Sequence, residues 1–220
     1  MKKITYIVML FFISVSLTSC VKNDDLSQFR EEVLADRGSG EKEILDKLAN
    51  NIYYGFYEYA TYRLSDGKLL FKYIYGHTDD IDITIDNSGI ISLKKKDRLT
   101  YINPENNKYC SMIGAVAGNN IENEDNVNYF YQNLYHKGSF DLFTKDDHIF
   151  INFSDGTYKI YDKNNLYLIE SKYLSKGNEV VTKLEHHSNN VDEVYDKYIN
   201  SLNNMEEVSN LDELRDNWDV

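Results

Sequence analysis

Five histidines and a group of acidic residues near position 80 are the side chains of this chain best suited to metal binding or acid–base chemistry. The histidines are His77, His136, His148, His186 and His187. No two of them have the i, i+4 spacing with which a helix presents ligands to zinc. The acidic residues Asp79, Asp80, Asp82 and Asp86 lack the glycine and the ordered ligand positions of a calcium loop. No nucleophile elbow, phosphate-binding loop or dinucleotide fingerprint occurs either. The sequence therefore predicts no catalytic residue, no metal site and no cofactor.

Cys20 is the cysteine with a recognisable sequence context, because a distinct N-terminal segment ends there. Lys2 and Lys3 form a basic start, the apolar residues 4–15 follow, and residues 17–20 read Leu-Thr-Ser-Cys. A basic start, a short apolar stretch and small residues before a cleavage point are typical of a secretory signal peptide. We therefore expect the chain to be exported.

The same segment resembles the precursor of a bacterial lipoprotein, because residues 17–20 fit each position of the lipobox. The resemblance implies a signal peptide over residues 1–19, cleavage between Ser19 and Cys20, and a diacylglyceryl thioether on Cys20. Each buried CH₂ contributes ~0.8 kcal/mol, so two or three acyl chains anchor a protein stably. Residues 22–25 resemble the tags of one lysine and several acids that send lipoproteins of the Bacteroidetes to the cell surface. The implied location is extracytoplasmic at the bacterial cell envelope, with the outer membrane and the cell surface both open.

Two other interpretations of this segment remain. In the first, the segment is an ordinary cleaved signal peptide and Cys20 is incidental. In the second, the segment is an uncleaved membrane helix. Residues 4–17 are short for a membrane-spanning helix, which needs roughly 20 apolar residues. No second long apolar run follows, so the expected membrane contact is the lipid on Cys20.

The net charge argues against nucleic acid as a partner. Removing residues 1–19 takes away Lys2 and Lys3 and no acidic residue, which leaves 22 basic against 36 acidic residues and a net charge of −14. A field of that sign repels phosphate backbones. It suits a solvated acidic surface or a basic partner. Cys110, left alone if Cys20 carries lipid, has no activating neighbour in the sequence, and we expect a buried structural thiol there and not a nucleophile.

Hydrophobic periodicity predicts helix, then sheet, then helix. Residues 20–40 read as a lipidated cysteine followed by an acidic tether and helix, and residues 41–52 read as a second helix. From residue 53 the period changes to two, and in residues 80–86 isoleucines alternate with polar residues. The expected strands are 57–64, 68–75, 80–86, 90–94, 139–144, 148–153, 157–161, 166–173 and 179–184. Residues 103–138 are the least regular part.

Short turns between these strands predict an antiparallel arrangement. Asp66-Gly67 and Asp155-Gly156 supply the positive φ angles that tight hairpins need. Residues 190–218 return to helix, with an Asn190/Glu193 cap and a continuous apolar stripe that should pack on an open sheet face. The fold class is therefore α+β. We expect one domain over residues 41–220, an antiparallel β-meander (53–184) flanked by N-terminal and C-terminal helices.

Tyrosines between residues 53 and 62 are the one group with a functional character. On a strand, Phe56 and Ala60 share one face, and Tyr57 and Tyr59 share the other. If the core takes the first face, Tyr57 and Tyr59 are exposed and form a candidate binding surface for a sugar or a protein. The alternative is that tyrosine serves here as a β-forming residue and that both faces are partly covered.

These observations predict a lipid-anchored envelope protein that acts as a non-catalytic binding or interaction module for a protein or a small molecule. Two alternatives remain open. One is an envelope hydrolase whose active site assembles from residues distant in the sequence. The other is an inhibitor or immunity lipoprotein that acts on a basic partner through charge complementarity.

Overall fold

The computed structural model describes residues 23–51, 53–85, 88–114 and 123–214. The predicted signal peptide, Ser19, Cys20 and Trp218 lie outside these residues. The chain divides into two compact units, one within Met1–Asn50 and Ile121–Ser139, the other within Asn51–Asn120 and Phe140–Val220. The sequence predicts one domain for residues 41–220. The division arises because a helical segment interrupts the run of strands.

In its described residues, the first unit contains three helices joined through a shared, partly exposed polar contact. They are α2 (Asn23–Leu34), α3 (Ser39–Ala49) and α4 (Asn123–Lys137). Arg30 of α2 donates two hydrogen bonds to Asp46 of α3, at 3.0 and 2.7 Å. The hydroxyl of Tyr131 in α4 donates to the same carboxylate at 2.7 Å. The hydrogen bond from Arg30 lowers the pKa of Asp46. Asp46 therefore connects all three helices through one ionised carboxylate.

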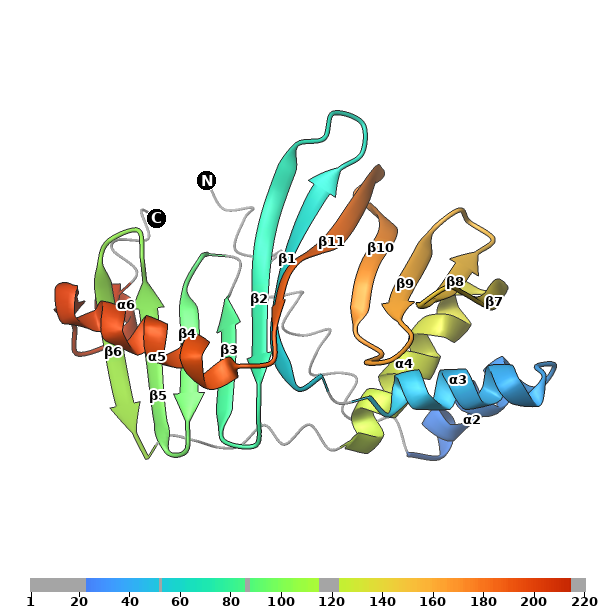
Figure 1. Cartoon of the computed structure of the whole chain (residues 1–220), viewed down its shortest axis with the longest axis horizontal. Helices are drawn as coiled ribbons and strands as arrows, with labels where there is room; N and C mark the ends of the chain where they lie inside the picture. Colours follow the sequence, from blue (N-terminus) through green and yellow to red (C-terminus); the bar gives the residue numbers. More distant parts are fainter. Residues whose placement is uncertain (1–22, 52, 86–87, 115–122, 215–220) are drawn as a thin grey trace, which may run out of the picture. The chain divides into compact units, whose positions relative to one another are not determined.

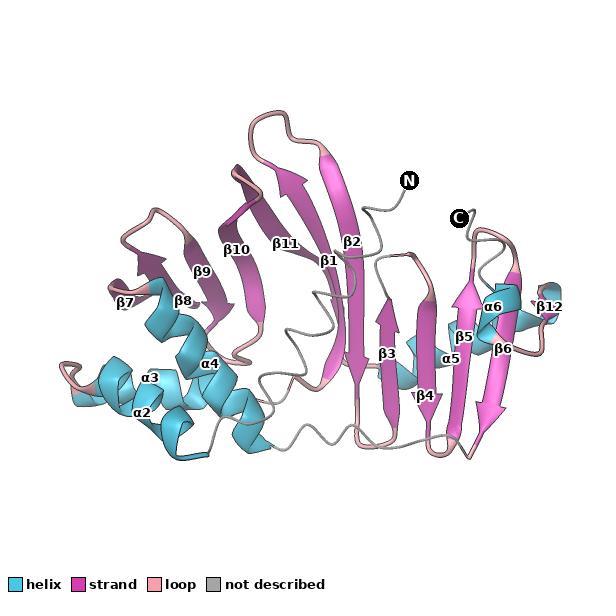
Figure 2. Ribbon diagram, turned by 180° about the vertical axis from the view of Figure 1, so that it is seen from behind, coloured by secondary structure: helices cyan, strands magenta, loops and turns pink. Residues whose placement is uncertain are grey.

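The second unit is built on one sheet of twelve strands, in the order β12-β6-β5-β4-β3-β2-β1-β11-β10-β9-β8-β7. The strands are β1 (Gly55–Arg63), β2 (Leu69–His77), β3 (Ile81–Ile85), β4 (Ile91–Lys95), β5 (Arg98–Asn103), β6 (Lys108–Ile113), β7 (Phe140–Lys145), β8 (His148–Phe153), β9 (Tyr158–Asp162), β10 (Leu168–Ser175), β11 (Asn178–Ser188) and β12 (Glu206–Glu207). Neighbouring strands are antiparallel, except that β12 runs parallel to β6. Figure 2 shows two meanders that meet where β1 pairs with β11. The predicted α+β class with a mainly antiparallel sheet is confirmed.

Helix α5 (Val191–Ser201) crosses one face of β3–β6 (Figure 1), and the core beneath it also includes residues of β1 and β2. Its N-cap is Asn190, whose side chain accepts a hydrogen bond from the backbone N–H of Glu193, as the sequence predicts. The apolar stripe of the helix packs on a core of strand residues. That core contains Phe56, Ile74, Ile81, Ile83, Ile91, Leu93, Ile102, Val191, Tyr195 and Leu202, the last from the 3₁₀ turn η2 (Leu202–Asn204). The predicted helix on an open sheet face is therefore confirmed.

The chain then crosses the sheet edge and covers the opposite face. After β12, helix α6 (Leu211–Leu214) packs with Cys110, Ile90 and Val208 on the far side from α5 (Figure 2). Cys110 is buried there, and this burial raises the pKa of its thiol. The expectation of a buried structural thiol is confirmed, because a thiol that stays protonated is a poor nucleophile.

One part of the chain differs from the sequence expectation, and the turns agree with it. Residues 103–138 are predicted to be irregular, yet they contribute to β5, contain β6, and hold the fifteen-residue helix α4. The tight turns, in contrast, agree with the prediction: Gly67 and Gly156 have φ angles of +67° and +79°. Short turns are local, whereas α4 is rich in asparagine, which favours helices only weakly.

Candidate functional site

Strand β1 places two tyrosines opposite aromatic side chains of its neighbouring strands. Tyr57 lies opposite Tyr75 of β2 and opposite His187 of β11, and Tyr59 lies opposite Tyr73 of β2. The rings of Tyr59 and Tyr73 stack with centroids 4.9 Å apart, and those of Tyr57 and His187 stack at 4.8 Å. Directly opposed residues have their Cβ atoms about 5 Å apart, so antiparallel pairing itself brings these rings together.

Two further rings extend this contact beyond the paired strands. Tyr167 lies 5.6 Å from Tyr57 and 4.9 Å from His187, and Tyr53 meets Tyr57 edge-on at 6.2 Å. We define the tyrosine cluster as these seven residues, all of which belong to the second unit: Tyr53, Tyr57, Tyr59, Tyr73, Tyr75, Tyr167 and His187.

The expectation that Tyr57 and Tyr59 are exposed is wrong, since only 4% and 6% of their surfaces are accessible. The core under α5 does take the opposite face of β1, through Phe56. Tyr57 and Tyr59 are nevertheless buried because β1 is a central strand. Tyr75 of β2 and His187 of β11 cover Tyr57, and Tyr73 of β2 covers Tyr59. The partly exposed members of the cluster are Tyr53, Tyr73, Tyr75, Tyr167 and His187. A candidate binding surface would therefore be formed by these outer rings.

The buried hydroxyls find backbone partners. The Tyr57 hydroxyl donates to the carbonyl of Tyr54 at 2.8 Å, and the Tyr59 hydroxyl donates to the carbonyl of Leu168 at 2.9 Å. Burial raises the pKa of Tyr57 to about 12 and raises that of Tyr59 further. Burial likewise raises the pKa of Tyr73 to about 12. The cluster is therefore a neutral aromatic surface at physiological pH.

His187 carries the one buried ring nitrogen in the cluster that lacks a partner. Its Nε2 atom is buried and makes no hydrogen bond with any described residue. Burial lowers the pKa of His187, so its imidazole is neutral near pH 7. The close approach depends on Gly55, which has φ +126°; a Cβ there would lie 3.2 Å from Nε2 of His187 and from the hydroxyl of Tyr57. An unsatisfied buried nitrogen costs about 1–3 kcal/mol, which a fold rarely retains without a reason.

A second histidine, His77, does have a defined partner and lies beside the cluster. Nδ1 of His77 lies 2.6 Å from Oδ1 of Asp82, and Lys94 approaches the other carboxylate oxygen at 3.5 Å. The ring of His77 stacks on Tyr75 at 6.2 Å. This arrangement is a polar border on β2 and β3. In the described ranges, no group of three or more His, Cys, Asp or Glu side chains is arranged to hold a metal ion.

The sequence identifies Tyr57 and Tyr59, places Tyr53 in the same tyrosine-rich segment, and misses the other four members of the cluster. One signal was present: Tyr57-Glu58-Tyr59 and Tyr73-Ile74-Tyr75 are two Tyr-x-Tyr pairs on strands joined by one short turn. Antiparallel pairing then places the four tyrosines on one face. His187 gives no such signal, because its contact with Tyr57 depends on pairing between strands far apart in the sequence.

Comparison with known proteins adds little to this geometry. No family model and no curated protein sequence matches the chain. Among solved structures, a LolA superfamily protein from Nitrosomonas europaea is 12% identical and has a TM-score of 0.24, over 67% of this chain and 92% of that chain. A protein from Arabidopsis thaliana is 12% identical and has a TM-score of 0.15, over 71% of this chain and 94% of that chain. Scores this low carry no functional argument, so the residues themselves must carry it.

Proposed function

We propose that this chain is a lipid-anchored binding protein of the bacterial cell envelope that holds a small ligand against the tyrosine cluster. The observation that carries the ligand site is the buried, unpartnered Nε2 of His187 beside stacked rings. A ligand group that hydrogen-bonds to this nitrogen would remove the cost of leaving it unsatisfied. The role is binding and not catalysis, because the cluster has neutral rings and no carboxylate within it.

The chemistry of the cluster restricts the ligand class. Tyrosine rings present flat apolar faces together with hydroxyl groups, which suits a neutral molecule such as a sugar ring or an aromatic ring. The net charge of −12 repels anions. We therefore expect a neutral ligand with one flat apolar face and one group that hydrogen-bonds to His187.

The ligand site is tested by two matched pairs of variants of the full-length protein, titrated calorimetrically with methyl glycosides and small phenols. His187→Ala removes the unpartnered nitrogen, whereas His186→Ala changes the adjacent residue, whose ring contacts Phe56 on the opposite face. Tyr75→Leu removes a ring of the cluster, whereas Tyr62→Leu removes one whose hydroxyl donates to Glu185 at 3.0 Å. We expect His187→Ala and Tyr75→Leu to weaken binding roughly tenfold to a hundredfold, for a loss of about 1–3 kcal/mol. Equal effects within each pair, or no binding across the panel, would exclude the site.

The anchor is supported by the lipobox at residues 17–20. No helix in the described part of the chain is both long and apolar enough to cross a membrane. The anchor is tested by growing cells that produce the wild type and Cys20→Ser with labelled palmitate. We expect the label on the wild type alone, and equal labelling of both would refute the anchor. Cys110→Ser is the matched control, because it removes the chain's other thiol and leaves the lipobox intact.

A further inference from the structure

An apolar, basic surface lies where two hairpins of the second unit end side by side. We define the hairpin tip as residues 63–72, around the β1–β2 turn, and residues 172–180, around the β10–β11 turn. The backbone N–H of Leu64 donates to the carbonyl of Glu179 at 3.0 Å, and Glu179 pairs with Leu174, so the two turns are adjacent. Figure 1 shows the β1–β2 hairpin extending beyond the ends of strands β3 and β4.

Large apolar side chains are exposed at this tip. They are Leu64, Leu69, Leu70, Phe71 and Leu174, with accessible fractions between 40% and 55%. They occupy both faces of the hairpin. The pairing of β1 with β2 shifts by one residue here, so that Phe71 lies opposite Thr61 and Leu69 lies opposite Tyr62. Because Thr61 and Tyr62 are consecutive and point to opposite faces, Phe71 and Leu69 do so too. A rigid protein surface would cover one of these faces, whereas a fluid lipid interface would cover both.

The charge of the tip is opposite to that of the whole chain. Its two segments contain five basic residues (Arg63, Lys68, Lys72, Lys172, Lys176) and two acidic ones (Asp66, Glu179), in a protein with a net charge of −12. Lys72 pairs with Glu58 at 2.9 Å and Lys172 with Glu179 at 2.6 Å. Lys68 and Lys176, one at each turn, make no ion pair with a described residue.

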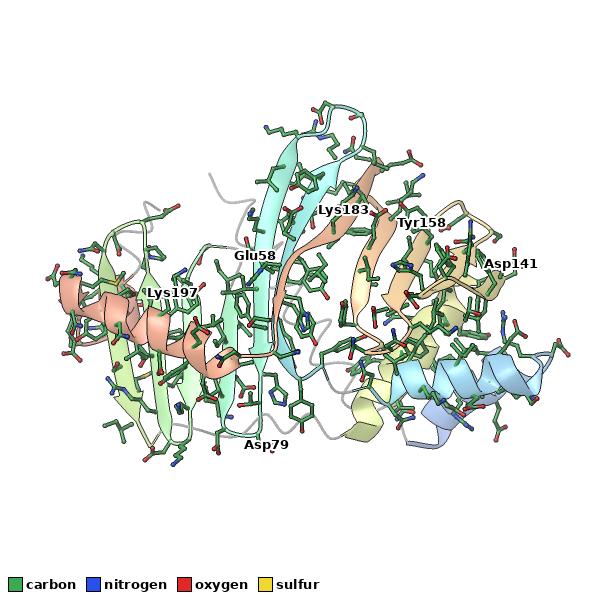
Figure 3. All side chains as sticks on the ribbon, in the orientation of Figure 1. Glu58, Asp79, Asp141, Tyr158, Lys183 and Lys197 are labelled. Carbon is green, nitrogen blue, oxygen red and sulfur yellow. The ribbon has the colours of Figure 1, made fainter. Side chains whose placement is uncertain are left out.

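Below the tip, the face of the sheet that carries Glu58 is polar, and its charges are paired with one another. Glu58 and Lys183, both marked in Figure 3, pair with Lys72 and with Glu170. On this face the belt of paired charges ends the apolar surface at the tip, whereas on the other face the ring of Phe71 lies 6.5 Å from that of Tyr73. The tip has a short apolar end, then two lysines at the turns, then a belt of paired polar groups. This order of groups matches the change from acyl chains to headgroups to water across a membrane surface.

We propose that the hairpin tip docks onto a bilayer that contains anionic lipids, with its leucines and Phe71 at the level of the acyl-chain boundary and Lys68 and Lys176 against the phosphates. The inference uses no residue of the tyrosine cluster. It is independent of the lipid on Cys20, although an anchored chain would bring the tip close to a membrane. Two weak attachments together hold a protein more firmly than either alone.

The test places a fluorescent reporter at the tip of the full-length protein reconstituted into vesicles. Phe71→Trp is compared with Phe143→Trp, an exposed aromatic on β7 with nearly the same accessible fraction, 42% against 44%. Both variants also carry Trp218→Phe, because Trp218 is the chain's single tryptophan. In vesicles of phosphatidylglycerol and brominated phosphatidylcholine, we expect strong quenching of the Phe71→Trp reporter and little of the Phe143→Trp reporter. Quenching that is equally weak at both positions overturns the proposal.

The charge component has its own matched control. Lys68→Gln/Lys176→Gln should lower the ratio of docked to undocked tip roughly 30-fold in anionic vesicles. Lys96→Gln/Lys145→Gln should not change it, because these two exposed lysines lie elsewhere, one in the β4–β5 turn and one at the end of β7. Equal effects of the two double variants overturn the electrostatic part. A blue shift that grows with protein density and ignores brominated lipid would place a second copy of the chain on the tip, and would also overturn the proposal. The vesicle experiment does not require acylation of Cys20. Failure of the docking proposal is therefore distinguished from failure of the anchor, which the palmitate labelling tests.

Discussion

The imidazole of His187 lies nearly parallel to the phenol ring of Tyr57, with centroids 4.8 Å apart and an interplanar angle of 22°. The two residues come from β11 and β1 and are directly paired across the strands. Tyr57 belongs to the buried interior of the tyrosine cluster, and the partly exposed ring of His187 holds a neutral, buried nitrogen against it. On our proposal, this pair is where burial, charge state and ligand contact meet.

The first prediction concerns acid stability. Burial lowers the pKa of His187, so the folded state favours the neutral imidazole. The stability from this group is present above the unfolded-state pKa of ~6.5 and is lost as the pH falls through the lower folded value. The free energy of unfolding should therefore decrease between pH 7 and pH 5 more steeply in the wild type than in His187→Gln, measured by urea denaturation. Parallel profiles for the two proteins would contradict the assignment.

A second prediction concerns alkaline stability. Burial raises the pKa of Tyr57 and Tyr73 to about 12, whereas in the unfolded chain both titrate near ~10. Between these values the unfolded state loses protons that the folded state keeps. Stability is therefore full below pH ~10 and falls above it by about 1.4 kcal/mol per pH unit for each such group. Tyr73→Phe should flatten this fall, as measured by thermal unfolding from pH 9 to pH 11.5, and an unchanged slope would argue against burial of the hydroxyl.

Gly55 provides a steric prediction. Its φ of +126° and the contacts that a Cβ would make with His187 and Ser188 predict that Gly55→Ala destabilises the fold by about 1–3 kcal/mol. Gly40→Ala in helix α3 is the control, because no atom lies within 4 Å of a Cβ built there. The control should be neutral or stabilising by up to about 1 kcal/mol, since alanine favours helix over glycine. Equal unfolding midpoints for the two variants would show that the Gly55 site can relax.

A buried hydroxyl pair beside the tyrosines allows a double-mutant cycle. The hydroxyls of Thr61 and Thr182 lie 2.7 Å apart between β1 and β11, and both residues are buried. Thr61→Val or Thr182→Val alone should cost about 1–3 kcal/mol, because each leaves the other hydroxyl unsatisfied. The double variant should recover most of that loss. Additive losses in chemical denaturation would show that the two hydroxyls do not depend on one another.

Local patterns predict the elements whose side chains meet close neighbours in the sequence. The isoleucines at 81 and 83 alternate with polar residues and are buried, as expected for a strand with one face on the core. Asn190 caps α5, and the stripe from Val191 to Met205 packs on the sheet. These features depend on a period or on one capping bond, and both are visible in a short window of sequence.

Elements that depend on partners distant in the sequence cannot be predicted from such local patterns. Helix α4 does carry apolar residues at helical spacing, namely Val127, Phe130, Tyr131 and Leu134, but asparagines between them weaken the pattern. Strand β6 follows the single proline, Pro104, and a turn in which Asn107 takes φ +58°. Of the tyrosine cluster, the predicted binding residues are Tyr57 and Tyr59 alone; the Tyr-x-Tyr pair at residues 73–75 is a local signal that this prediction does not use, and His187 joins through tertiary pairing alone.

The pairing of β1 with β11 also determines the order in which the sheet can form. Strands β2 to β6 pair with their sequence neighbours, as do β7 to β11, so each meander closes through short loops. Tyr57 and His187, 130 positions apart, meet only when the meanders join. Bringing such distant residues together costs chain-closure entropy, so these contacts form late and slow the final step of folding. The residues that we propose to bind the ligand are thus among the last to be assembled, and a newly made chain cannot bind until its second meander has been synthesised and docked.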